Sequence, residues 1–456
     1  MRISNPVLTI VLAVALSGCA TGGMSTADSV TRLEQQQRSD PQSAEVNRSL
    51  GIAYYKADRF AEARTALETA VKLDPRDGTS SLYLGLSDEA LGDLKGAKTA
   101  YSSYIQFGRT SRVRSQLQSR LAAITRLEIA ADAKTAVQQE ASLSTQPGDP
   151  RTVAVLPLRF SGTDTSLKPL ERGFADLLTT DLARSSQLTL VERARMQALL
   201  DEMKLQQSGA TDAATNVRAG KLVRAGRVVQ GAILQMGSSD LRVDAAVVDV
   251  PTSRVEGSAQ AADQLEQLFA MEKKIALDLF TQLGVTLTVA ERQQIEQRPT
   301  RSMQAFLAYS RGLTAEDEGR YDAAARYFDE AVRLDPGFNA AQSKSQEARA
   351  IAAGAVVNAA TVEVSLRGTS EGAVVAAAQQ GSPISSSAGN PGLGSTAQGI
   401  AGGLNTSAMD GATLGASTVG TTAQPTSKDP VAAGTGSDNP AATAKVTVVI
   451  IRPRTP

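Results

Sequence analysis

The sequence has no histidine and no tryptophan, and its 456 residues include a single cysteine. Histidine is the most common general base near neutral pH and the most common zinc ligand, so its absence disfavours many hydrolytic and zinc-dependent mechanisms. Lys plus Arg equals Asp plus Glu, at 47 each, and no basic excess indicates nucleic acid. We therefore expect a protein that is not an enzyme, needs no cofactor or metal and does not bind nucleic acid.

The remaining polar residues do not form a recognisable catalytic motif. Glu192 and Arg193 stand where a strand-like run meets a helical pattern, and a carboxylate at a helix start is commonly explained by the helix dipole. The segments "GSSD" and "GTDTS" offer hydroxyls and carboxylates without a nearby histidine, and they are typical of turns. No glycine-rich phosphate loop follows a strand.

The amino terminus has the layout of a secretory signal peptide. Basic Arg2 is followed by an apolar run from Val7 to Leu16, which is shorter than the roughly 20 residues that a membrane-spanning helix needs. The run ends in "LSGC", which resembles the lipobox of bacterial lipoproteins and implies lipidation of Cys19, the only cysteine. An ordinary signal peptide with a chance cysteine is the alternative.

The lipobox resemblance also implies an address. Ala20, and not an aspartate, follows the cysteine, so the resemblance implies sorting to the periplasmic face of the outer membrane. The protein would contact that membrane through lipidated Cys19.

Two helical repeats follow, and a third lies far downstream. The stretch "AEVNRSLGIAYYKADRFAEARTALETAVKLDP" from Ala44 resembles a tetratricopeptide repeat (TPR), and similar patterns begin near Gly78 and Ala305. The signature positions are Gly51, Tyr54, Ala63 and Pro75 in the first, Gly85 and Ala97 in the second, and Gly312, Ala324 and Pro336 in the third. The resemblance implies protein partners.

So few repeats need a cap, because a helical hairpin cannot cover its own apolar face. Apolar residues at helical spacing predict one long capping helix after the second repeat and another after the third: Val113, Leu117, Leu121, Ile124 and Leu127, then "FNAAQSKSQEARAIAAG". Two uses of the repeat faces stay open. They bind a partner in a concave groove, or they pack on the central domain.

The last hundred residues are rich in Gly, Ala, Ser and Thr, which predicts disorder. "TVEVSLRG" from Thr361 and "KVTVVIIRP" from Lys445 alternate and are β-branched, which predicts two strands. Either these strands pair with each other, or the second joins the edge of a partner sheet.

Between residues 150 and 292 the pattern predicts the order β-α-β-α-α-β-β-β-α, an α+β domain with helices packed on a mixed sheet. Its first strand, "TVAVLPLRF", contains Pro157, which predicts an edge or a bulge. "VAVLPL", "LVERARMQALL" and "AGRVVQGAI" make this region resemble the CsgG-like (curli production assembly and transport) family. Periplasmic domains such as the amino-terminal part of TolB and the synthase activator LpoB are similar in architecture.

Secreting members of that family form rings in which each subunit donates long hairpins to a shared channel. Here Val228–Met236 and Leu241–Val250 are separated only by turn residues, and no aromatic residue occurs from 175 to 268. Membrane strands need about 9 to 11 residues each and aromatic girdles. We therefore predict a tight water-soluble hairpin and a protein that is not itself a pore.

The predicted organisation is a signal peptide (1–19), a linker (20–42), a TPR pair with a long capping helix (43–146), a CsgG-like domain (151–290), a TPR unit with a capping helix (300–355) and a low-complexity tail with a terminal strand (356–456). The combination favours an assembly, transport or scaffolding lipoprotein for surface structures such as curli-like fibres. A regulator of an envelope enzyme, similar to LpoB, and a soluble periplasmic peptide-binding TPR module are the alternatives. A homo-oligomer is left open.

Overall fold

The computed structural model describes residues 25–143, 145–203 and 213–384, and within this range the chain forms two compact units. The repeat unit contains residues 25–124 and 353–384, and the sheet unit contains most of residues 125–352. The predicted signal peptide with Cys19, most of the predicted tail and the strand from Lys445 lie outside the described residues.

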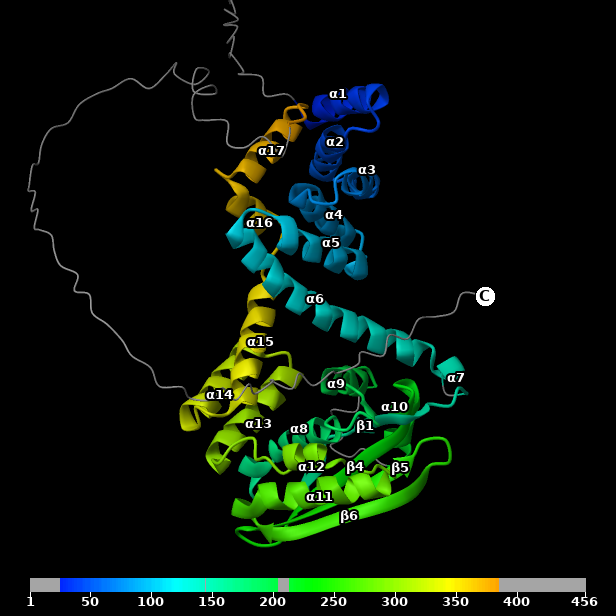
Figure 1. Cartoon of the computed structure of the whole chain (residues 1–456), viewed down its shortest axis with the longest axis vertical. Coiled ribbons are helices and arrows are strands. Elements are labelled where there is room, and N and C mark those ends of the chain that lie inside the picture. The colour runs from blue at the N-terminus through cyan, green and yellow to red at the C-terminus, as the bar shows by residue number, and fades with distance from the viewer. Residues whose placement is uncertain (1–24, 144, 204–212, 385–456) are drawn as a thin grey trace, which may run out of the picture. The chain divides into compact units, whose positions relative to one another are not determined.

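The repeat unit is entirely helical (Figure 1). Its first five helices are α1 (Thr26–Ser39), α2 (Ala44–Lys56), α3 (Phe60–Leu73), α4 (Gly78–Ala90) and α5 (Leu94–Phe107). Ser43, Asp77 and Asp93 begin α2, α4 and α5 by accepting a hydrogen bond from a backbone N–H of the first turn, which satisfies a donor that the helix itself cannot pair. The pairs α2–α3 and α4–α5 are the two predicted repeat hairpins.

The predicted capping helix is present as α6 (Ser111–Gln138), which is followed by α7 (Glu140–Leu143). Val113, Leu117 and Ile124 are buried against the hairpins, as their spacing predicts. Leu127, which continues the same apolar series, is 48% exposed.

The predicted linker over residues 20–42 is wrong for most of its length, because α1 occupies it. Val30 and Leu33 are buried beside Leu50 and Ala53 of α2. Ser25 caps the helix by accepting from Asp28 N at 3.2 Å. The polar composition of the segment is typical of a linker, but the two buried side chains are sufficient to hold the helix against α2.

The predicted strand at Thr361 and the predicted tail from residue 356 are also wrong over the described residues. They form α16 (Ala359–Leu366) and α17 (Ser370–Gln379), and Figure 1 shows α17 beside α1 and α2. Asn358 and Thr361 form a reciprocal capping box that starts α16. Burial of Val362 and Leu366 at helical spacing then outweighs the β-propensity of the segment.

The sheet unit is built on one mixed sheet with the order β3-β1-β4-β5-β6, and β2 pairs with β4 beyond the end of β1. The strands are β1 (Asp149–Val155), β2 (Arg159–Ser161), β3 (Thr189–Leu190), β4 (Ala225–Gln235), β5 (Asp240–Asp249) and β6 (Arg254–Gln264). β1 is parallel to β3 and β4, and β4, β5 and β6 are antiparallel. The predicted α+β class is confirmed, and so is the order of elements, except that the first predicted strand is divided into β1 and β2.

Pro157 does not mark a sheet edge, because β1 lies between β3 and β4. Instead the proline separates β1 from β2, and both pair with β4, at Val229 and at Ile233 respectively. Proline lacks the N–H that would continue the hydrogen-bond ladder, so the strand is interrupted there and pairing with β4 resumes two residues later.

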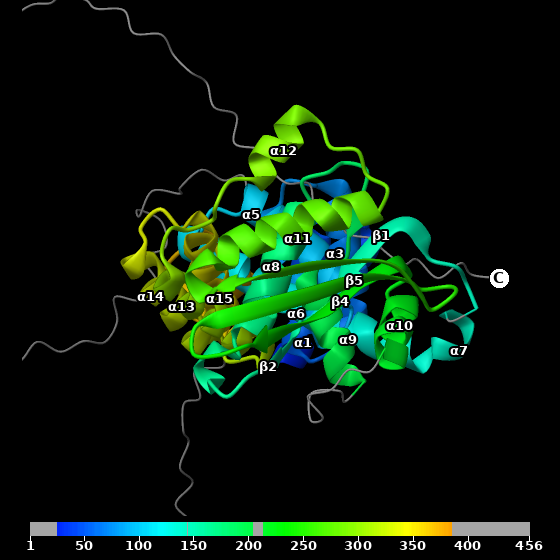
Figure 2. The same cartoon turned by 90° about the horizontal axis from the view of Figure 1, so that it is seen from below.

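Helices cover both faces of the sheet. One face, with Val229 and Val243, packs on α8 (Leu170–Leu182) and α11 (Leu268–Gln282), and Figure 2 shows α11 running along β5 and β6. The other face, with Val228 and Val248, packs on α9 (Arg193–Glu202) and α10 (Ala213–Leu222). The shorter elements are η1 (Thr165–Leu167), η3 (Leu265–Gln267) and α12 (Val289–Ile295).

The third repeat belongs to the sheet unit instead of forming a separate domain over 300–355. It consists of α13 (Met303–Asp317) and α14 (Tyr321–Leu334), followed by α15 (Asn339–Ala355). Phe306 of α13 contacts Phe269 of α11, with ring centroids 5.2 Å apart. Both side chains belong to the hydrophobic core that also includes the buried side chains of α8. For this repeat the structure favours packing on the central domain.

The hairpin between β4 and β5 is as short as the sequence predicts. Residues 236–239 form the turn, Met236 N donates to Asp240 O at 2.8 Å, and Gln235 is paired with Leu241. Among the described residues no single helix is long and apolar enough to cross a membrane; α15 and α16 reach that length and composition only together, and they are bent by 93°.

Candidate functional site

The predicted signature glycines lie where two helices of a repeat approach each other. A β-carbon on Gly51 would lie 2.4 Å from Leu67 Cγ, and one on Gly85 would lie 2.5 Å from Tyr101 Cδ1. In the third repeat the equivalent distance from Gly312 to Phe328 Cε1 is 2.4 Å. The facing helices are equally tight, with fully buried alanines at Ala63, Ala97 and Ala324. These residues set the packing of each hairpin and face no open surface.

The other signature residues also have structural positions. Pro75 and Pro336 lie in the turns that follow α3 and α14. Tyr54 donates from its hydroxyl to Glu34 Oε1 of α1 at 2.8 Å, and Arg59 Cζ lies 4.3 Å from the centre of its ring. Burial and the neighbouring Glu34 raise the pKa of Tyr54 to about 12, so it stays a donor at neutral pH. These contacts give the signature residues structural roles.

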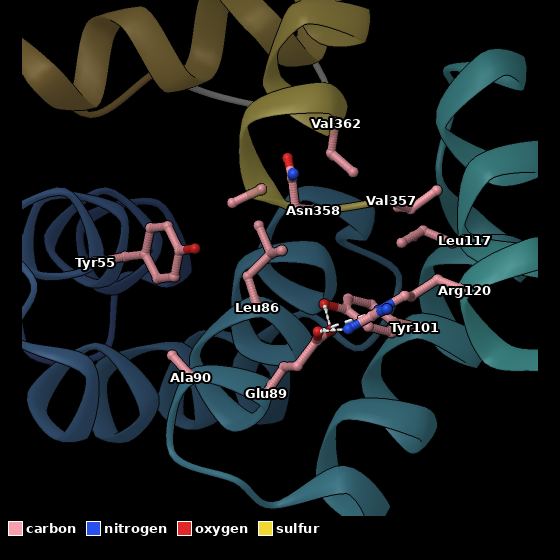
Figure 3. A pocket seen from close by; sticks show the side chains of 11 residues that line it. Tyr55, Leu86, Glu89, Ala90, Tyr101, Leu117, Arg120, Val357, Asn358 and Val362 are labelled. Atoms are coloured by element: carbon pink, nitrogen blue, oxygen red, sulfur yellow. Dashed lines mark hydrogen bonds and ion pairs between the residues drawn. The ribbon is translucent and has the colours of Figure 1, made fainter. Parts of the chain in front are cut away.

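A cavity of about 180 Å³ lies within the repeat unit, and Figure 3 shows the side chains around it. Its lining is mainly apolar, with one charged pair, and comes from α2, α4, α5, α6 and the start of α16: Tyr55, Leu86, Glu89, Ala90, Tyr101, Leu117, Arg120, Val357, Asn358, Ala359 and Val362.

The charged pair in this cavity is internally satisfied. Tyr101 donates to Glu89 Oε2 at 2.8 Å, and Arg120 Nε donates to Glu89 Oε1 at 3.1 Å, as Figure 3 shows. Arg120 Nη1 also donates to Gly354 O at 3.1 Å. Because these groups already bind one another, the cavity offers mostly apolar surface, which suits an apolar side chain better than a charged ligand.

A second feature is a buried charge cluster where the third repeat meets α8 and α9. It contains four carboxylates and four cations: Asp176, Glu316, Asp317, Glu347, Arg126, Arg172, Arg193 and Lys344. Arg193 Nη2 lies 2.7 Å from Glu316 Oε2, and the same guanidinium also pairs with Asp317. Arg193, the first residue of α9, thus holds the end of α13.

The charges of this cluster compensate one another. Burial alone would raise the pKa of Glu316, but Lys344, Arg193 and Arg126 outweigh it and lower that pKa to about 2. Burial raises the pKa of Asp176, although Arg193 and Lys344 oppose the change. Tyr309 of α13 donates to Asp176 Oδ2 at 2.8 Å. The cluster holds the third repeat against α8 and α9 within the sheet unit.

A further acid pair lies between α8 and α11. Glu272 is fully buried, its Oε2 is 3.1 Å from Lys273 Nζ, and Lys273 also pairs with Asp181 of α8. Burial, with the nearby Asp181, raises the pKa of Glu272 to about 8, and burial also raises the pKa of Asp181. Burial thus favours the protonated form of Glu272 in the folded chain.

We expect this proton to make stability fall at alkaline pH. The pKa of Glu272 is higher in the folded chain than its ordinary value of 4.5, so its contribution is present below about pH 4.5 and is lost as the pH rises through about 8. Glu272→Gln, which cannot ionise, should raise the free energy of unfolding at about pH 9 by on the order of 1–2 kcal/mol and change it little at about pH 5.

Urea unfolding of both proteins at the two pH values measures this difference. Glu296→Gln, at a side chain that is 55% exposed, is the matched control and should leave stability unchanged at both. An equal effect of Glu272→Gln at both pH values would show that the carboxyl is already charged in the folded chain.

Sequence reasoning missed the groups that join distant segments. Arg193 was considered only with its neighbour Glu192, whereas its partners lie 123 and 124 residues away. Glu371 and Glu363, in the predicted tail, contact the repeat helices. In the described residues no group of three or more His, Cys, Asp or Glu side chains is arranged to hold a metal ion.

Comparison with known proteins identifies the parts of the chain. Residues 134–262 match the family described as curli production assembly/transport component CsgG. Residues 27–111 and 305–338 match tetratricopeptide repeat families. The first of these matches includes α1, consistent with its packing on α2.

No curated protein matches the chain. Among solved structures, the LpoB C-terminal domain from Salmonella enterica is similar at 15% identity and a TM-score of 0.21, over 29% of this chain and 94% of that one. The family matches and the fold agree, and the chain carries a CsgG-type domain flanked by tetratricopeptide repeats.

Proposed function

We propose that the protein is a lipid-anchored adaptor at the periplasmic face of the outer membrane, serving the assembly or export of surface structures such as curli-like fibres. The observation that carries the proposal is the combination, in one chain, of a CsgG-type domain, two tetratricopeptide regions and the lipobox-like "LSGC" sequence that ends in Cys19.

A binding role without catalysis is part of this proposal. Tetratricopeptide repeats generally mediate protein–protein interaction through extended surfaces. The side chains of the buried charge cluster and of the charged pair in the cavity bind one another within the chain. The adaptor would therefore act by holding partners together.

We also propose that the adaptor does not form the export channel. The four-residue turn between β4 and β5 replaces the long hairpin that a channel subunit would donate. Purified lipidated protein is expected to give no conductance across planar bilayers, and stable single-channel steps would contradict this part of the proposal.

Loss of the anchor is expected to release the protein from the membrane. Cys19→Ala removes the thiol that would be acylated, and stable anchoring needs more than one acyl chain. In cell fractionation with palmitate labelling, we expect the wild type in the outer-membrane fraction with label, and Cys19→Ala without label and outside that fraction. Surface fibres, scored in the same cells, should be reduced.

Two matched variants make this test specific. Ser17→Ala keeps a small residue before Cys19 and should leave labelling and location unchanged. Ala20→Asp should keep the label and move the protein to the inner membrane, because the residue after the cysteine is the sorting signal. If Cys19→Ala stays in the outer membrane and fibres form normally, the anchored-adaptor function is wrong. Co-purification of an envelope enzyme instead of export components would favour a regulator.

A further inference from the structure

One side of the repeat helices is covered by a distant part of the same chain. α16 and α17 lie more than 200 residues after the repeats, yet Val362, Leu366, Val374, Val375 and Ala378 are buried in one cluster with repeat side chains such as Tyr83 and Tyr104. We call the repeat surface that receives them the repeat groove, made of Arg48, Lys56, Tyr83, Tyr104 and Thr110.

One glutamate of the segment is recognised in detail. Glu371, in the first turn of α17, is 5% exposed and accepts hydrogen bonds from Tyr104 Oη at 2.7 Å, Arg109 N at 2.9 Å and Thr110 N at 3.1 Å. Thr110 Oγ1 donates to the same carboxylate. The two backbone donors immediately precede α6, where the helix dipole also favours an anion.

A second glutamate and two carbonyl groups complete the contacts. Glu363 of α16 pairs with Lys56 and accepts from Tyr83 Oη at 3.4 Å. At the other end, Ser29 donates to Gln379 O and Arg48 donates to Ile384 O. The repeat groove thus contacts two carboxylates, an apolar helix face, the last carbonyl of α17 and a carbonyl beyond that helix.

The segment does not fill the groove completely. The cavity of about 180 Å³ borders α16 at Ala359 and Val362 and the residues just before it, Val357 and Asn358, so an apolar side chain larger than those present would find room there. Val364 of α16 is 55% exposed. Contacts that are specific but incompletely packed are those of a segment that another helix can replace.

We propose that the repeat groove is a docking site for an amphipathic helix of a partner protein that has an apolar stripe and a glutamate in its first turn, and that α16–α17 occupies this site as an internal competitor. The contacts of Glu371 and Glu363 define the acidic chemistry of the partner, and the cavity accepts its additional apolar side chain. The inference goes beyond the proposed function and holds wherever the protein resides.

The test uses the full chain and a fluorescent synthetic peptide of residues 358–381, which carries the chemistry of the proposed partner. Glu371→Ala in the chain weakens the internal competitor and leaves the groove intact. We expect the peptide to bind this variant about tenfold or more tightly than the wild type, because a buried charged hydrogen-bonding group is lost only from the competitor. A peptide with Glu371→Gln should bind the variant about tenfold more weakly.

Val364→Ala, on the exposed side of α16, is the matched control and should bind the peptide like the wild type. Equal affinity of the peptide for all three chains, or no binding to a Glu371→Ala chain with unchanged circular dichroism, would overturn the proposal. A dimer formed by mutual exchange of α16–α17 would also overturn it, because a second copy would then be the occupant.

Hydrogen exchange of the wild-type chain gives an answer even if Glu371→Ala does not fold. The proposal requires that excess peptide accelerates exchange of the α16–α17 amides while those of α4 stay protected. If the α16–α17 amides exchange as slowly as those of α4, with or without peptide, the segment is a permanent part of the core and the proposal is wrong.

Discussion

Replacing Arg193 with alanine is expected to destabilise the sheet unit by about 3 kcal/mol, the lower end of the range for a broken buried pair. The buried Glu316 and Asp317 lose one cation but keep Arg126, Lys344 and Arg172 as partners. Glu316 and Asp317 both pair with this guanidinium, and their side chains are 3% and 4% exposed. Urea unfolding followed by hydrogen exchange assigns the loss to the sheet unit.

Arg349→Ala provides the comparison. Arg349 pairs with Asp329, but its side chain is 64% exposed, so its removal should cost at most about 1 kcal/mol. Similar losses for Arg193→Ala and Arg349→Ala would mean that the charge cluster is hydrated.

Asp77→Ala is expected to have a comparable effect in the repeat unit. Asp77 caps α4 by accepting from Thr79 N at 3.1 Å, and its Oδ2 lies 3.0 Å from Arg48 Nη1 with both side chains at most 2% exposed. Removing Asp77 leaves the buried guanidinium of Arg48 without its carboxylate, which typically lowers the free energy of unfolding by about 3–5 kcal/mol. The loss of the helix cap adds to this effect.

The residues offer two matched comparisons for this variant. Asp77→Asn keeps an oxygen for the cap and should lose less stability than Asp77→Ala. Asp93→Ala removes a similar cap from α5 at a side chain that is 36% exposed, and should cost about 1 kcal/mol. Hydrogen exchange in α4 and α5 measures all three. A loss from Asp77→Ala no larger than from Asp93→Ala would show that the buried ion pair contributes little.

The sequence allowed the central domain to be predicted well because its patterns are local. The apolar stretches Val228–Met236 and Leu241–Val250 predicted β4 and β5, and the turn between them followed from the small or polar residues that separate them. The repeats were equally legible, since Gly51, Gly85 and Gly312 each recur opposite a large side chain. Both kinds of signal lie within one or two elements.

The predictions were wrong where burial against a distant segment determines the secondary structure or the role of a residue. "TVEVSLRG" has the composition of a strand, but Asn358 caps it as a helix and the repeat groove buries Val362 and Leu366. Its partners begin more than 200 residues earlier, so no local window contains the reason. The same holds for Arg193, whose role depends on Glu316 and Asp317.

The discontinuity of the repeat unit also affects the order of folding. Its two pieces, residues 25–124 and 353–384, are separated by the whole sheet unit, so the chain closes a loop of more than 200 residues before α17 reaches α2. Such non-local contacts form late, whereas domains made of contiguous sequence fold first as the chain is synthesised. The sheet unit comes second in the sequence, yet it can fold completely before the repeat unit does. The amino-terminal repeats become complete only when α16 and α17 pack on them.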